Sequence, residues 1–131
     1  MSTLKVDNLL NAAGNESPIS VPGAAKAWVN YNGSSGTTGQ NDTTIRSSYN
    51  VSSVTNNASG DYTVNFTNNM SNANYAAICS GGNNASTGEG AWVATYDDAT
   101  NTVSGVRIAT YQSDGSGNDP TEQVSVVVFG D

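Results

Sequence analysis

Apolar and polar side chains alternate along much of this chain, and that alternation restricts the possible folds more than any other feature. The clearest stretch is Asp61–Thr67, in which Tyr62, Val64 and Phe66 occupy every second position. Successive side chains of a β-strand point to opposite faces, so a period of two predicts a strand with one buried face. The one candidate for helical periodicity, Val6–Ala13, is too short to form a stable helix alone. The sequence therefore predicts an all-β protein.

Segments rich in Gly, Asn, Ser and Asp separate the alternating stretches, as turns separate strands. In the first stretch we expect Ala27, Val29 and Tyr31 on one face and Trp28 on the other. Seven short strands at regular spacing are typical of an antiparallel β-sandwich or a jelly-roll-like domain. The predicted strands are Lys26–Asn32, Ile45–Thr55, Asp61–Thr67, Tyr75–Ser80, Ala91–Tyr96, Thr102–Tyr111 and Glu122–Phe129.

Short turns join two pairs of these strands into predicted hairpins. The second and third strands are connected through Asn56–Gly60, and the fifth and sixth through Asp97–Asn101. The last strand, Glu122–Phe129, is apolar on both faces, which predicts an interior strand that is packed on both sides.

The chain of 131 residues fits one domain preceded by an arm. Residues 1–25 contain Ser17-Pro18 and Val21-Pro22-Gly23, and residues before Pro favour extended backbone. We expect 1–25 to be an anchoring arm that is poorly ordered in isolation, and 26–131 to be the β domain. The arm has no apolar signal region, so we expect a protein made in a cytoplasm without an export signal of its own.

Composition argues against several function classes. Charged residues make up 11% of the chain, and the net charge is −7. The four cations, Lys5, Lys26, Arg46 and Arg107, are too scattered for a nucleic-acid or membrane-surface site. The chain has no His and a single Cys, which argues against Ser–His triads and His- or Cys-rich metal sites. We expect no cofactor and no enzymatic activity.

A few polar residues allow a chemical role, and each also has a structural interpretation. Asp97-Asp98 could act as an acid–base pair, but carboxylates in tight turns commonly hydrogen-bond their own backbone. Asp114, Asn118 and Asp119 offer oxygen ligands for Ca²⁺, although their spacing matches no known calcium loop, and a solvated loop is the favoured interpretation. Cys79 is expected to be a small buried core residue.

Exposed aromatic rings beside Asn side chains could bind carbohydrate by stacking on sugar rings. Trp28, Trp92, Tyr96 and Tyr111 are candidates, with core packing or a subunit contact as the favoured alternative. Recognition on a β-sandwich commonly falls on the loops at the domain ends. The three long polar loops that could recognise a host surface glycan, or could simply be solvated caps, are Gly33–Thr44, Gly81–Gly90 and Gln112–Thr121.

Several segments, in order and at similar spacing, carry a family likeness. They are Thr3–Asp7, Val21–Gly33, Ile45–Val54, Gly60–Thr67 and Ala73–Ala76. Together they resemble bacteriophage tail-fibre and virion appendage proteins, especially those of marine phages. The resemblance implies a virion structural protein with a trimeric β domain at the tip of a fibre or appendage. In this family the module often ends a longer fibre chain, whereas Met1 here lies close to the module, so we expect no shaft.

These observations lead to one main hypothesis and one alternative. The main hypothesis is a phage virion structural protein, either a tail fibre or a capsid decoration, made in the host bacterial cytoplasm. We expect a homotrimer because the chain is poor in Leu, the main core-forming residue, and strands apolar on both faces can pack against sister chains. The arm would bind other tail or capsid proteins, and the β domain would project for host attachment. The alternative is a free carbohydrate-binding, lectin-like module.

Overall fold

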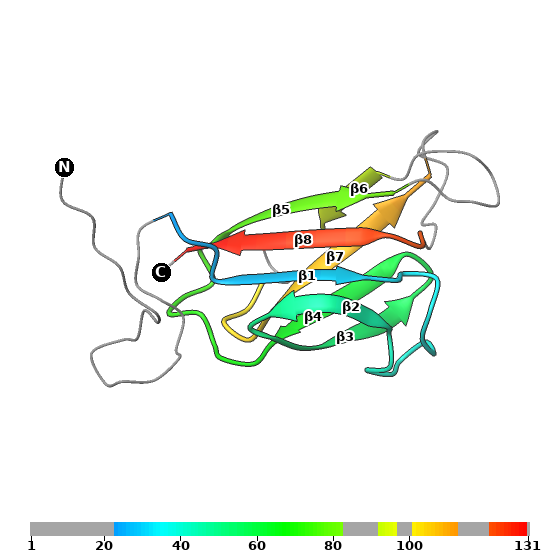
Figure 1. The fold of residues 1–131 in the computed structure, drawn as a ribbon, viewed down its shortest axis with the longest axis horizontal. Coiled ribbons are helices and arrows are strands. Elements are labelled where there is room, and N and C mark those ends of the chain that lie inside the picture. Colours follow the sequence, from blue (N-terminus) through cyan, green and yellow to red (C-terminus); the bar gives the residue numbers. More distant parts are fainter. Residues whose placement is uncertain (1–22, 83–91, 97–100, 113–120, 131) are drawn as a thin grey trace, which may run out of the picture.

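Two antiparallel four-stranded sheets pack face to face and form a β-sandwich (Figure 1). The computed structural model describes residues 23–82, 92–96, 101–112 and 121–130. One sheet has the strand order β2-β1-β8-β5, and the other has the order β3-β4-β7-β6. The strands are β1 (Ala27–Tyr31), β2 (Ile45–Tyr49), β3 (Val51–Ala58), β4 (Asp61–Phe66), β5 (Ala76–Gly81), β6 (Trp92–Thr95), β7 (Gly105–Tyr111) and β8 (Val124–Phe129).

The core lies between the two sheets and is built mainly from Val and aromatic residues. In β1 the alternation works as predicted, because Val29 and Tyr31 are buried while Trp28 points outward. In β4 the buried face is the predicted one, and β7 and β8 contribute their inward positions in the same way. The all-β sandwich expected from the period of two is therefore confirmed. The buried core residues are Ala27, Val29, Tyr31, Val54, Tyr62, Val64, Phe66, Met70, Tyr75, Val106, Ile108, Val124, Val126 and Val128.

A pair of tyrosines joins the two sheets inside the core, toward the end of the sandwich where β1 ends. The rings of Tyr31 and Tyr62 meet edge to face, with their centroids 5.3 Å apart. The Tyr62 hydroxyl donates a hydrogen bond of 2.6 Å to the carbonyl oxygen of Gly33. A Cβ at Gly33 would lie 2.6 Å from the carbonyl oxygen of Thr121, so only Gly allows this close approach.

The single strand predicted over Ile45–Thr55 is wrong, because the chain turns at Asn50. Asn50 has a φ of 53°, in the left-handed region that Asn tolerates better than most residues. Its side-chain amide donates to the carbonyl oxygens of Lys26 and Asn68, and its side-chain oxygen accepts a bond from the amide of Asn68. The corner is therefore fixed on both sides, and the chain passes from β2 in one sheet to β3 in the other.

Both predicted hairpins form, with shifted boundaries. Strand β3 continues to Ala58, so the turn to β4 is shorter than the predicted Asn56–Gly60. Strand β7 pairs with β6 but begins at Gly105 rather than Thr102. Strand β5 begins at Ala76, one residue after the predicted start.

Strand β8 lies in the interior of its sheet, between β1 and β5, as predicted. Its inward residues are buried in the core, but its outward residues Val127 and Phe129 are only half-buried. The prediction that β8 is packed on both faces is therefore wrong for a single chain. The segment Val6–Ala13, the one candidate for helical periodicity, and nearly all of the predicted arm lie outside the described residues.

Candidate binding surfaces

The sandwich presents two outer faces, one on each sheet, and their side chains differ in kind. We call the outer surface of the β2-β1-β8-β5 sheet the apolar face, because a row of apolar side chains crosses it. We call the outer surface of the β3-β4-β7-β6 sheet the ladder face, because polar side chains bond to one another from strand to strand. The apolar face points toward the viewer in Figure 1.

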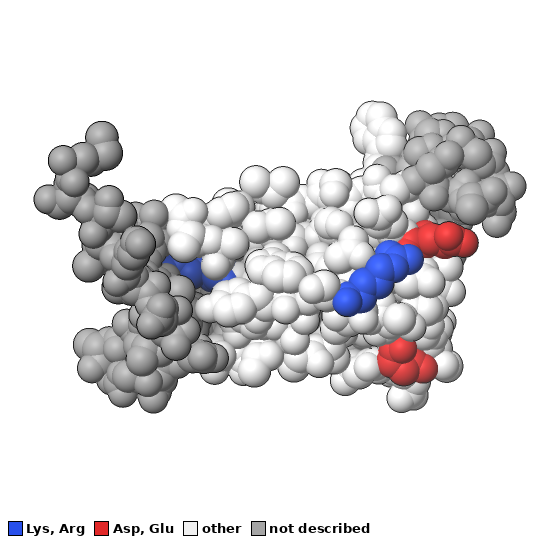
Figure 2. Space-filling view, in the orientation of Figure 1, with Lys and Arg blue, Asp and Glu red and all other residues white. Residues whose placement is uncertain are grey.

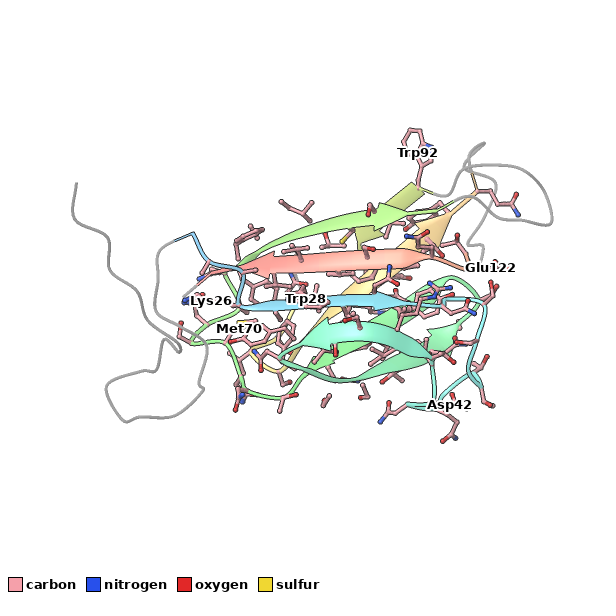
Figure 3. The ribbon with its side chains drawn as sticks, in the orientation of Figure 1. Lys26, Trp28, Asp42, Met70, Trp92 and Glu122 are labelled. Carbon is pink, nitrogen blue, oxygen red and sulfur yellow. The ribbon has the colours of Figure 1, made fainter. Side chains whose placement is uncertain are left out.

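The row on the apolar face runs across all four strands of its sheet. Trp28 on β1 is opposite Tyr49 on β2 and, on its other side, opposite Val127 on β8. Val127 is in turn opposite Ile78 on β5. Side chains directly opposite in neighbouring strands share a face, so the four residues form one continuous row. Trp28 is 37% exposed and Ile78 62% exposed, which leaves the row accessible to another molecule. Trp28 is labelled at the middle of this sheet in Figure 3.

Polar residues border this row on one side. Two positions away from the row on each of the four strands, the outward residues that lie opposite one another are all polar. Among them, the Asn30 amide donates to the Ser125 hydroxyl at 2.9 Å. Charged side chains visible in Figure 2 lie only toward the two ends of this face. At one end Arg46 donates to the carbonyl oxygens of Tyr31 and Glu122, at 3.1 and 2.6 Å. The middle of the apolar face is therefore uncharged.

The ladder face has a different construction, in which amide and hydroxyl groups link β3 to β4. The Asn65 amide donates to the hydroxyls of Ser53 and Thr55 at 3.0 and 2.9 Å. The Asn57 amide donates to the Thr63 hydroxyl at 2.9 Å. These bonds supply partners inside the chain for outward polar groups, which stabilises the face without any further molecule.

An ion pair continues the network from β4 to β7. Arg107 binds both carboxylate oxygens of Asp61, with Nε–Oδ1 at 2.8 Å and Nη2–Oδ2 at 2.5 Å. Asn57 donates to the same carboxylate at 3.1 Å. Burial alone would raise the pKa of Asp61, but the hydrogen bonds from Arg107 and Asn57 and the charge of Arg107 outweigh it. The pKa of Asp61 is therefore lowered, and its carboxylate stays ionised.

Three of the four predicted sugar-stacking residues come together at the β6 side of the ladder face. Trp92 on β6 is directly opposite Tyr111 on β7. Tyr96 follows β6, and the guanidinium carbon of Arg107 lies 4.1 Å from the centre of its ring. Trp92 is 70% exposed and projects away from the sandwich in Figure 3. The fourth candidate, Trp28, lies on the apolar face, so the structure separates it from the others.

The remaining candidates are placed only in part. Cys79 packs against the core but is only half-buried, rather than the buried core residue that was expected, and burial raises the pKa of its thiol to about 11. Such a thiol is almost entirely protonated at neutral pH and therefore unreactive. The loop Gly33–Thr44 is described, and Asp42 within it accepts a bond of 2.7 Å from the amide of Thr37. The predicted sites that lie outside the described residues are Asp97-Asp98, Asp114, Asn118, Asp119 and most of the loops Gly81–Gly90 and Gln112–Thr121.

Comparison with known proteins returned no match, either to a family model, to a curated protein or to a solved structure. Within residues 23–82, 92–96, 101–112 and 121–130, no group of His, Cys, Asp or Glu side chains is arranged to hold a metal ion. The same ranges contain no helix that could span a membrane.

The pair of Asp61 and Arg107 was not predicted from the sequence. The two residues are 46 positions apart in the chain, and nothing local to either one indicates the other. The sequence does indicate that both residues take outward positions in alternating strands, because each lies beside apolar residues that point inward. The pairing itself requires knowledge that β4 lies next to β7 and in which register.

Proposed function

We propose that this protein is a non-catalytic structural and attachment module of a phage virion, and that it assembles as a homotrimer through the apolar face. The row of Tyr49, Trp28, Val127 and Ile78 carries the proposal. When a sister chain covers these exposed side chains, their apolar surface is removed from water, and that burial drives association.

The composition of the apolar face fits a protein interface. Specific interfaces have an apolar, often aromatic centre that is depleted in charge, with a polar rim around it. Here the aromatic Trp28 lies in the middle of the row, between Tyr49 and Val127, and Asn30 and Ser125 belong to the polar border. The uncharged centre also suits contact between identical chains, because each carries a net charge of −7 and would otherwise repel its copies.

Three copies, rather than two, are proposed from the resemblance to trimeric fibre tips. The small core of the single chain supports self-association, because the buried residues of the described chain include many Val residues and no Leu. Shared burial between copies compensates for a core of this kind. In the virion the segment 1–25 would anchor the trimer to neighbouring tail or capsid proteins, and the β domain would project toward the host.

The proposed assembly is tested by the mass of the full chain in solution. Sedimentation at micromolar concentration should give three times the chain mass of 13.4 kDa. A folded monomer under these conditions would contradict the homotrimer.

The proposed location is tested on purified particles. Quantitative mass spectrometry should find the protein in the virion, in a small multiple of three for a tail fibre or in hundreds of copies for a capsid decoration. A chain lacking residues 1–25 should still fold and associate but should no longer join the particle. Normal incorporation of that shortened chain would contradict the anchoring role of the arm.

A further inference from the structure

We infer that the aromatic strip on the ladder face, defined by Trp92, Ala94 and Tyr96 of the β6 edge, binds neutral carbohydrate. This site is separate from the apolar face and does not depend on the proposed trimer. The spacing of the rings, the contacts that hold them and the charge around them suit such a ligand.

The spacing of the strip suits a chain of sugar rings. Trp92, Ala94 and Tyr96 occupy alternate positions, so their side chains share the outer face, while Val93 packs against the core. Trp92 and Tyr96 are four residues apart, which places their Cα atoms about 13 Å apart along an extended strand. The small Ala94 lies between them, so no bulky side chain of the strand separates the two rings.

The neighbouring strand supports both ends of the strip. Tyr111 on β7 is opposite Trp92, and Ala109 is opposite Ala94. At the other end of the strip, the backbone amide of Tyr96 donates to the Arg107 carbonyl oxygen at 2.9 Å. This bond continues the β6–β7 pairing beyond the end of β6. The strip therefore sits on paired backbone rather than on a loose chain end.

The ring of Tyr96 is also held by electrostatics. The Arg107 guanidinium lies 4.1 Å from its centre, within the range of a cation–π contact. Asp61 fixes that guanidinium through two bonds, and Asp61 is itself 4% exposed. A ring that is fixed before binding loses little conformational entropy on contact with a ligand.

Trp92 supplies the accessible surface. At 70% exposed it has the largest exposed fraction among the large hydrophobic side chains of the described chain. Isolated exposed apolar residues are common on proteins. Here two aromatic rings lie along one strand edge and on one face, so a single extended ligand can contact both. An aromatic face binds the C–H face of a pyranose ring.

The charges around the strip favour a neutral sugar. The Arg107 charge is neutralised by Asp61, so this pair gives no net attraction for an anion. The whole chain carries −7, which repels uronic or sialic acids at low ionic strength. A neutral hexopyranose chain avoids this repulsion and still gains from stacking.

The two tryptophans of the chain allow a direct test, because Trp28→Phe leaves Trp92 as the sole tryptophan. We would titrate this variant with soluble neutral oligosaccharides of glucose in α and β linkage, of mannose and of N-acetylglucosamine, and with an oligogalacturonate as the acidic probe. At least one neutral series should shift the Trp92 emission saturably, and the acidic probe should not.

Substitutions identify the surface that binds. By calorimetry on the otherwise native chain, Trp92→Ala should weaken binding about tenfold, with Trp92→Phe retaining part of it. Trp28→Phe, the matched change on the apolar face, should leave the affinity unchanged. Absence of a saturable response to every neutral probe, preferential binding of the acidic one, or equal affinity of Trp92→Ala would each overturn the inference. A change in the solution mass of Trp92→Ala would overturn it in favour of a subunit contact.

Discussion

The two outer faces of the sandwich have the same backbone arrangement, but their side chains differ in whether they find partners within the chain. On the ladder face, Asn57, Asn65, Asp61 and Arg107 bond to groups of the same chain and link β3, β4 and β7. On the apolar face, the central row has no such network, and its rings and methyl groups remain open to another molecule. The network over β3, β4 and β7 stabilises the monomer, whereas the row across all four strands of the apolar face leaves apolar area exposed and favours association.

The largest expected effect separates the faces by their role in assembly. Ile78→Lys places a charge within the apolar row and should convert the proposed trimer to a folded monomer, because an interface that buries this row tolerates an unpaired charge poorly. Ala94→Lys adds the same charge to the exposed edge of the ladder face and should leave the mass unchanged. Sedimentation of both variants checks this; if both or neither dissociate, the assignment of the interface to the apolar face fails.

The second prediction compares the two arginines of the described strands, one on each sheet. Arg107→Leu should lower the free energy of unfolding by about 2–3 kcal/mol, because it leaves the nearly buried Asp61 carboxylate without its ionic partner. Arg46→Leu removes one part-buried and one exposed hydrogen bond to carbonyl oxygens and should cost about 1 kcal/mol. Urea unfolding measures both. Equal losses would mean that the ion pair contributes no more than a surface contact.

Acid should weaken the ladder face more than the apolar face. The pKa of Asp61 is lowered in the folded chain, so its contribution is complete above the pKa of the unfolded chain and is lost as the pH falls through the folded value. Asp61→Asn should therefore be less stable than the native chain at neutral pH. The difference should shrink as the pH falls below about 4. A difference that stays constant down to pH 2 would contradict the lowered pKa.

The smallest expected effects come from hydrogen bonds that a single Asn side chain donates, with one such Asn on each face. Asn65→Ala removes two bonds within the ladder face, and Asn30→Ala removes the bond to Ser125 beside the apolar row. Each should lower the free energy of unfolding by about 0.5–1.5 kcal/mol. Thermal unfolding at several protein concentrations checks them. A much larger loss for Asn30→Ala that depends on concentration would extend the interface into the polar border.

Local alternation was enough to predict the sandwich and most of its strands. The buried faces of β1 and β4 follow directly from a period of two, and the outward position of Trp28 was predicted with them. The corner at Asn50 could not be predicted, because side chains on both sides of it continue to suit strands. The change is in the backbone: Asn50 takes a left-handed φ, and the chain passes there from β2 in one sheet to β3 in the other.

The candidate surfaces required the sheet order as well as the strands. Tyr49, Trp28, Val127 and Ile78 are spread over the whole chain, and they form a row only because β1 and β8 are neighbours in the order β2-β1-β8-β5. The four aromatic candidates for sugar stacking were identified as a set from residue type alone. The sheets divide them, with Trp28 on one face and Trp92 on the other, and residue type carries no information about that division.

The central claim, that the apolar face is covered in solution and the ladder face is not, is tested most directly by the two tryptophans. Trp92→Phe leaves Trp28 as the sole reporter on the apolar face, and Trp28→Phe leaves Trp92 on the ladder face. In a single chain they are 37% and 70% exposed, so acrylamide would quench both. In the proposed trimer, Trp28 should be almost unquenched with blue-shifted emission, while Trp92 stays strongly quenched. Ready quenching of Trp28 at micromolar protein concentration would contradict the claim.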